Sequence, residues 1–350
     1  MCETSKDLLK ELSQIIGISG DEKVVSTAMK KHMDKLCDEI IYDNLGSIFA
    51  VKKCGKENAK RVMVTAHMDE VGFMITEIAN NGLASFINIG SISDSALYGS
   101  RVRVKTRTSE VYGVIVADED SAAKANGKQM KIDFGATSID DVKKLGIMVG
   151  DSAVLDGVFV TLGNRVIGKA LDSRNGCALA IEILEALKDV KFDFDLYVGA
   201  SVMEEVGQRG GTTATGLIEP DLGIVLDGGA ANDYKGKDNE VGKLGKGVLV
   251  RYYDKGMMPN RGLLNELVEV CDKNNIDYQY YYTMALSDAA WVHKLFAGCP
   301  TLHVGICARN THTGNTMIDL HDYACAKQAA IEVIKGLNED KIESFKASNR

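Results

Sequence analysis

Hydrophobic residues near the N-terminus recur every three or four positions, which is the spacing of amphipathic helices. They predict one helix over 5–16 and a second over 24–36. Two short apolar runs follow, EIIYD (39–43) and SIFAVKK (47–53), with a glycine-containing turn between them. This order is typical of a β-hairpin.

The segment RVMVTAHMDEVG (61–72) begins as a buried strand and continues into a cluster of polar residues. Between 73 and 165 the pattern changes to short strands separated by turn sequences. Within this stretch only SIDDVKKLG (138–146) has helical character. Many short strands with turns between them indicate a small all-β unit.

From residue 166 onward, predicted strands alternate with predicted helices. The strands are VIGKAL (166–171), DLYVGASV (195–202), DLGIVLD (221–227), YQYYYTMAL (278–286) and TLHVGI (301–306), and the helices cover 174–187, 260–275 and a last segment from about 320 to beyond 335. Such alternation implies a mostly parallel sheet with helices on both faces. We therefore expect an α/β domain made of 1–72 and 166–350, interrupted by a β domain at 73–165.

The composition is that of an ordinary globular protein, with 45% hydrophobic and 26% charged residues. No apolar run approaches the roughly 20 residues of a membrane helix, and the N-terminus lacks the apolar centre of a signal peptide. A net charge of −8 without a basic stripe argues against nucleic acid as a partner. The eight cysteines form no CxxC pair, which favours reduced thiols and a cytoplasmic location.

Acidic residues and histidines stand where predicted strands end. They are His67, Asp69, Asp172, Glu204, Glu205, Asp227 and, a few residues after its strand, His312. In open α/β sheets, the binding crevice lies at the carboxyl ends of the strands. We therefore expect these side chains to meet in one crevice.

Four carboxylates in one crevice would repel one another unless protons or cations compensate their charge. Two divalent cations would do so. Two histidines with carboxylates and without cysteine suit catalytic zinc or cobalt better than magnesium, which prefers oxygen ligands. The adjacent pair Glu204 and Glu205 suits two roles, one in metal binding and one in proton transfer.

Each residue taken alone also has a simpler interpretation. His67 would be a hydrogen-bonded core or surface histidine, Asp172 a helix N-cap, and Asp227 a turn residue before two glycines. The remaining candidates are assigned structural roles because they lack acidic neighbours at a strand end: His32, His293, His303 and His321. Only the joint pattern predicts a metal site.

The motifs themselves resemble one family, the co-catalytic metallo-aminopeptidases that form tetrahedral (TET) particles, including glutamyl aminopeptidases and proteins labelled "cellulase M" or endoglucanase. The matching stretches are AHMDEVG (66–72), IDFGATS (132–138), GKALDSRNGC (168–177), EEVGQRGG (204–211), VLDGG (225–229), SDA (287–289) and PTLHVGI with the following His312. The resemblance implies a three-layer αβα zinc-peptidase-like domain with an inserted PDZ-like β-barrel that mediates dimerisation.

The resemblance also implies roles for single residues. His67 and Asp227 would hold one metal, Glu205 and His312 the second, and Asp172 would bridge both. Asp69 would orient His67, and Glu204 would be the general base. The chain departs from the family at Asn310, Thr313, Val248 and the segment 117–128.

The leading hypothesis is therefore a cytoplasmic aminopeptidase with two Zn²⁺ or Co²⁺ ions per subunit that removes N-terminal residues from short peptides. A glycoside hydrolase is the alternative, although 6% aromatic residues are few for a sugar-stacking cleft. A catalytically silent binding protein on the same fold is a third. The resemblance further implies a homo-oligomer, from a dimer up to a tetrahedral dodecamer. The β unit is not expected to be needed to build the metal cluster.

Overall fold

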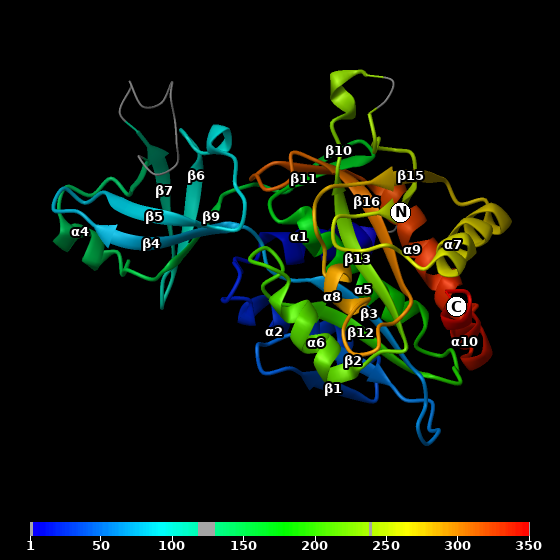
Figure 1. Cartoon of the computed structure of the whole chain (residues 1–350). Coiled ribbons are helices and arrows are strands. Elements are labelled where there is room, and N and C mark those ends of the chain that lie inside the picture. Colours follow the sequence, from blue (N-terminus) through cyan, green and yellow to red (C-terminus); the bar gives the residue numbers. More distant parts are fainter. Residues whose placement is uncertain (1–2, 118–129, 238–239, 350) are drawn as a thin grey trace.

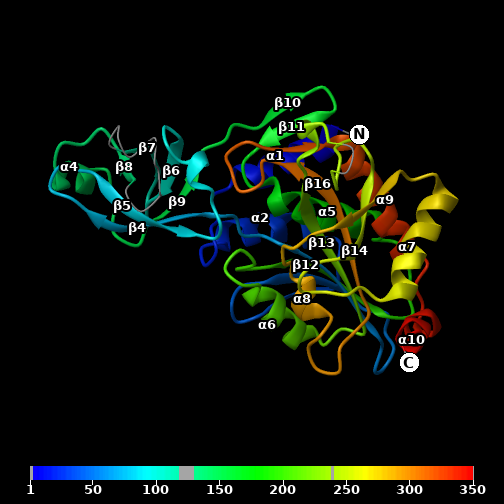
Figure 2. The same cartoon turned by 45° about the horizontal axis from the view of Figure 1, so that its top comes forward.

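The computed structural model describes residues 3–117, 130–237 and 240–349. Most of the divergent segment 117–128 lies outside these described residues. The chain forms a body around a large mixed sheet and a separate small barrel that lies to one side of it in both views (Figures 1 and 2).

The large sheet has eleven strands. In spatial order the main path is β1 (Glu39–Tyr42), β2 (Ile48–Lys52), β12 (Asp195–Ser201), β3 (Arg61–His67), β13 (Leu222–Ala230), β16 (Thr301–Arg309), β17 (Thr316–Asp319), β11 (Arg165–Gly168) and β10 (Val160–Leu162), with β14 (Val248–Tyr253) and β15 (Tyr278–Tyr282) branching from β16. The hairpin predicted near the N-terminus is confirmed as β1 and β2.

The four central strands, β12, β3, β13 and β16, run parallel, as the alternation of helices and strands predicts. The outer strands β1, β2, β10, β11 and β17 pair antiparallel with their neighbours, and short connections join β1 to β2, β10 to β11 and β16 to β17. The branch strands β14 and β15 pair parallel with each other. The strand β10 belongs to this sheet, where it pairs with β11. Its assignment to the inserted β unit from sequence is therefore wrong, since periodicity does not reveal the partner of a three-residue strand.

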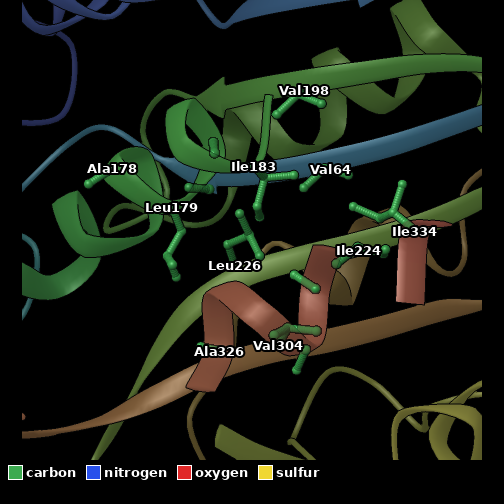
Figure 3. Close-up of a cluster of buried hydrophobic side chains, with 14 of the residues drawn as sticks. Val64, Ala178, Leu179, Ile183, Val198, Ile224, Leu226, Val304, Ala326 and Ile334 are labelled. Atoms are coloured by element: carbon green, nitrogen blue, oxygen red, sulfur yellow. The ribbon is translucent and has the colours of Figure 1, made fainter. Parts of the chain in front are cut away.

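Helices cover both faces of the sheet. One face carries α1 (Glu3–Gln14), α2 (Lys23–Met33), α5 (Leu171–Ala186), α7 (Arg261–Asn274), α9 (Leu320–Lys335) and α10 (Glu339–Ala347), and the other carries α6 (Arg209–Ile218) and α8 (Ala289–Val292). Within β3, Val64 packs against the α5 side, whereas Met63 packs against Ala214 and Ile218 of α6 on the other side. Because successive side chains of a strand point to opposite faces, β3 contributes to two hydrophobic cores. Figure 3 shows the larger core, between α5, α9 and the strands.

The barrel is closed and antiparallel, as the turn-rich sequence predicts. Its strand order is β4 (Gly72–Ile78), β5 (Ala84–Ile89), β8 (Lys131–Asp133), β7 (Glu110–Val116), β6 (Arg101–Lys105) and β9 (Ser152–Leu155). The predicted helical stretch is α4 (Ile139–Lys144), capped by the Ser138 hydroxyl, which accepts from the Asp141 backbone N–H. A second hydrophobic core fills this barrel.

Polar contacts join the barrel to the main body. Asp21, just before α2, accepts from the Lys105 ammonium at 2.6 Å and from the Ser152 hydroxyl at 2.8 Å. The buried Arg103 donates to the Gln14 carbonyl at 3.0 Å. These contacts involve three barrel residues from β6 and β9, so the barrel is tied to the body beyond its two chain connections.

The side chain of Arg174, on α5, is completely buried and ties three distant segments together. Its guanidinium donates to backbone carbonyls of Leu12, Ile15, Gly17 and Met68 at 2.6–3.2 Å, and it lies 3.5 Å from the Glu70 carboxylate. Lys169, 2.6 Å from the same carboxylate, is the second cation of this cluster. The cluster holds the N-terminal helix and the end of β3 against α5.

We expect Arg174→Leu to destabilise the fold by about 3–5 kcal/mol, because the buried carbonyls lose their hydrogen-bond donor and Glu70 loses one of its two cationic partners. The matched control is Arg61→Leu, since Arg61 forms an exposed ion pair with Glu219 worth at most about 1 kcal/mol. Thermal unfolding of both variants measures the difference. Equal melting temperatures for the two would contradict the role of the buried cluster.

Candidate active site

The predicted site residues meet at the carboxyl ends of the central strands β12, β3 and β13. His67 is the last residue of β3, and Glu204 and Glu205 follow β12 by a short turn. Asp227 lies inside β13, which continues to Ala230, so the prediction that Asp227 ends this strand is wrong. Its side chain reaches the site because it shares a sheet face with Val225, opposite the main core.

Asp69 organises the acidic pair and the first histidine. One carboxylate oxygen accepts the Glu204 backbone N–H at 2.9 Å and lies 3.3 Å from His67 Nδ1. The other accepts the Glu205 backbone N–H at 3.0 Å and the Ser19 hydroxyl at 2.6 Å. Burial alone would raise the pKa of Asp69, but hydrogen bonding and charge from His67 hold this pKa below its usual value.

One group of possible metal ligands consists of His67, Asp172 and Asp227, whose ligand atoms lie within 4.8 Å of one another. His67 Nε2 is 3.6 Å from Asp227 Oδ1 and 4.0 Å from Asp172 Oδ1. Glu204 and Glu205 form a second such group with His67. The imidazole of His67 is thus surrounded by carboxylates and is not a simple core histidine.

A matching arrangement lies on the other side of Asp172. His312 Nε2 is 3.4 Å from Glu205 Oε1 and 3.8 Å from Asp172 Oδ2. One oxygen of Asp172 therefore faces His67 and the other faces His312. Asp172 has non-helical dihedral angles within the first turn of α5, and Ala170 occupies the N-cap position, so the N-cap interpretation of Asp172 is wrong.

His312 is oriented by the barrel. Its Nδ1 lies 2.6 Å from the backbone carbonyl of Ser91, in the loop that follows β5. Because that carbonyl can only accept, the Nδ1 proton is fixed there and Nε2 is left facing Glu205 and Asp172. The sequence predicted that the β unit is not needed to build the cluster, and this contact shows that the barrel nevertheless orients one of its members. Burial lowers the pKa of His312, but Glu205 outweighs this effect and raises the pKa to about 9.

The carboxylates are crowded and shielded from solvent. Burial, with Asp227 nearby, raises the pKa of Asp172 to about 6, and burial raises the pKa of Glu204 well above its usual value. Burial would also raise the pKa of Asp227, yet the neighbouring imidazoles of His303 and His67 hold it well below the usual value. Glu204 is further held by Gln208, whose amide donates to Glu204 Oε1 at 2.9 Å.

A cavity of about 430 Å³ opens over this cluster. Six of the seven predicted residues, all but Asp69, line it together with Lys255 and the segment 283–286. A cavity of this size accepts a small ligand or the end of a peptide. The arrangement thus combines a buried acidic cluster, two histidines and room for a substrate.

Several residues of the site were missed from the sequence. Ser19 and Ser91 belong to loops without a chemical motif, and their partners are distant in the chain. His303 was set aside for lack of an acidic neighbour, but its Nε2 lies 4.0 Å from Asp227 Oδ2. His32 and His321 also have acidic neighbours, Glu11 and Asp277, but neither acid lies at the carboxyl end of a strand. Sequence adjacency does not reveal partners on neighbouring strands or helices.

Known proteins are similar to this chain in both sequence and fold. A family model described as M42 glutamyl aminopeptidase matches residues 46–328. The glutamyl aminopeptidase of Lactococcus lactis subsp. cremoris is 31% identical, over 97% of this chain and 98% of its own. The crystal structure of a TET aminopeptidase from a marine sediment Thaumarchaeota archaeon has a TM-score of 0.93 and 32% identity, covering 98% of this chain and 100% of that one.

The Pyrococcus horikoshii TET1 peptidase, which can assemble into a tetrahedron or a large octahedral shell, has a TM-score of 0.86 and 26% identity, covering 95% of this chain and 100% of that one. These likenesses extend over nearly the whole chain, including the barrel. The chain belongs to the M42 glutamyl aminopeptidase family of peptidases.

Proposed function

We propose that this peptidase is a metal-dependent aminopeptidase that holds two divalent cations, Zn²⁺ or Co²⁺, in each subunit. The observation that carries the proposal is the position of Asp172, whose two oxygens face two separate sets of ligand atoms. The nitrogen and oxygen donors without sulfur fit catalytic zinc or cobalt. The buried, crowded carboxylates also call for compensating positive charge.

His67 and Asp227 would hold one ion, Glu205 and His312 the other, and Asp172 both. Two cations bound there would lower the pKa of a water molecule and polarise the scissile carbonyl. Asp69 and the Ser91 carbonyl would keep the two imidazoles turned toward the ions, as partners of metal-binding histidines commonly do.

Glu204 would act as the general base, taking a proton from the attacking water and returning it to the leaving amine. Its buried position raises its pKa well above that of a solvated carboxylate. A raised pKa suits a group that must accept and release a proton near neutral pH. The Gln208 amide fixes one oxygen of Glu204, which leaves the other free for this task.

Short peptides with a free N-terminus are the proposed substrates. The positively charged α-amino group would be attracted to the acidic cluster, and the terminal side chain would occupy the cavity toward the segment 283–286. This binding mode limits cleavage to the first peptide bond.

The test uses one peptide in two forms, free and N-acetylated, with and without a chelator. Mass spectrometry should show stepwise shortening of the free peptide only, abolished by the chelator and restored by Zn²⁺ or Co²⁺. Cleavage of the acetylated form at internal bonds would contradict an aminopeptidase, and full activity after chelation would contradict metal dependence.

The domain boundaries and the cell compartment remain part of the proposal. We assign catalysis to 1–72 and 166–350, together with the strand β10 that joins the same sheet, and dimerisation to the PDZ-like unit in the rest of 73–165. Within the described part of the chain, no helix has the length and apolar character to cross a membrane, and seven cysteines are free. Free thiols support a cytoplasmic location.

We also expect a homo-oligomer, from a dimer up to the twelve-subunit tetrahedron known for the similar TET proteins. Light scattering of the full chain measures the state directly. A mass of twelve subunits supports an enclosed chamber that admits only peptides, and a mass of two supports the dimer alone. A fully active monomer would contradict any need for assembly in catalysis.

A further inference from the structure

The imidazole of His303 is completely buried, in strand β16 behind the acidic cluster. Neither ring nitrogen has a hydrogen-bond partner among the described residues. The Oδ2 atom of Asp227 lies 4.0 Å from His303 Nε2. Buried polar groups are nearly always paired in native proteins, so this unpaired ring calls for an explanation.

The register of two parallel strands aims the ring at Asp227. In the pairing of β13 with β16, Val225 lies opposite His303, and Asp227 lies opposite Gly305. His303, Val225 and Asp227 therefore share one face of the sheet. Gly305 supplies the space, because a Cβ atom there would lie 2.7 Å from His303 Cε1. The ring thus extends past Gly305 toward the neighbouring carboxylate.

The position of the Asp227 carboxylate indicates which ring nitrogen donates. A neutral imidazole carries one N–H donor, and the second nitrogen is an acceptor. A donor on Nε2 faces the carboxylate, whereas a donor on Nδ1 faces no acceptor in the described structure.

The two oxygens of Asp227 have separate surroundings. Oδ1 accepts the Gly228 backbone N–H at 2.7 Å and lies 3.6 Å from His67 Nε2, on the side of the proposed metal. Oδ2 faces His303 instead. A donor at Oδ2 would fix the rotation of the carboxylate and keep Oδ1 directed at His67.

We propose that His303 is a positioning residue that donates from Nε2 to Asp227 Oδ2 and so holds Asp227 in the orientation that binds metal. The inference rests on the proposed function, in which Asp227 is a ligand. The proposal requires the separation of 4.0 Å to shorten to a hydrogen-bond distance. Active-site hydrogen bonds are often long in the free protein and tighten when the site fills.

The test compares four variants by metal affinity, measured as competition with a chromogenic chelator, which needs no catalytic turnover. His303→Gln extends an amide toward the place of Nε2, whereas the shorter His303→Asn reaches only the place of Nδ1. His303→Leu removes the donor. Val304→Ala, on the opposite sheet face in the main core, is the matched control for lost packing.

We expect His303→Leu and His303→Asn to lose roughly 10- to 100-fold in affinity for one of two ions, the usual cost of removing the partner of a ligand. His303→Gln and Val304→Ala should retain near wild-type affinity. If His303→Leu does not fold, the comparison of His303→Gln with His303→Asn still tests the proposal, because both variants keep a polar side chain.

Equal affinity in wild type, His303→Asn and His303→Gln would overturn the positioning role while leaving the proposed function intact. An equal loss in Val304→Ala would also overturn it, since the loss would then follow general packing. A wild-type chain that binds no divalent ion would overturn both the inference and the proposed function, so the two failures are distinguishable.

Discussion

Glu204→Gln is expected to lower kcat by about 10²- to 10⁴-fold, the range that a general base contributes. The amide has the size of the carboxylate but cannot accept the proton from water. Gln208 can still hold the side chain, because its amide donates to the oxygen that the new glutamine retains. The metal content should stay at the wild-type level, because Glu204 is not one of the five proposed ligands.

The measurement is steady-state kinetics on an aminoacyl substrate, with metal analysis of the same sample. Glu219→Gln, at the exposed end of α6, is the control and should behave as wild type. Unchanged turnover in Glu204→Gln would remove the residue from its proposed role. A loss of activity together with a loss of metal would instead make Glu204 a ligand, as its proximity to His67 and Glu205 allows.

Asp172→Asn is expected to weaken binding of both ions by at least ~100-fold and to reduce activity accordingly. Mutation of a residue that only orients a metal ligand already lowers metal affinity 10- to 100-fold. Asp172 is proposed to contact both ions directly, so the loss should be larger. Asparagine has a single, neutral oxygen and cannot bind at both sides. Isothermal titration of the apo-protein should show two binding events in the wild type, both weakened in the variant.

The same variant should have the opposite effect on the apo-protein. The pKa of Asp172 is raised to about 6 in the fold by burial and by Asp227, so ionised Asp172 opposes folding. This penalty is full above pH 6 and disappears as the pH falls below the ordinary value near 4. At pH 7.5, apo Asp172→Asn should therefore be about 3 kcal/mol more stable than the apo wild type.

With metal present the order should reverse, because only the wild type gains the full binding free energy. Thermal unfolding with and without Zn²⁺ reports both comparisons in one experiment. If Asp172→Asn is less stable than the wild type in both conditions, the crowding of charge at Asp172 is not the cause that we assign.

The sequence predicted the fold where hydrophobic patterns are long. The strands β3, β12 and β13 are continuous apolar runs, which is why their place at the centre of a parallel sheet could be predicted. The pattern did not predict β14, or α8, which has only four residues. The last helix was predicted to run past residue 335, but α9 ends at Lys335. A separate helix, α10, begins at Glu339 with Asn338 as its N-cap.

The sequence predicted the part of the site whose residues stand at or just after the ends of strands. His67, Asp172, Glu204 and Glu205 could be placed together because parallel strands end at one edge of a sheet. The contact between His312 and the Ser91 carbonyl joins residues 221 positions apart, and it depends on how the barrel docks. No local pattern encodes such a contact, nor the approach of His303 to Asp227 across two strands.

The most direct test of the two-metal account is anomalous X-ray diffraction from crystals of the zinc-loaded protein, recorded above and below the zinc edge. The account predicts two anomalous peaks in each subunit, one between His67 and Asp227 and one between Glu205 and His312, with Asp172 between them. A single peak, or none in this cavity, would contradict it.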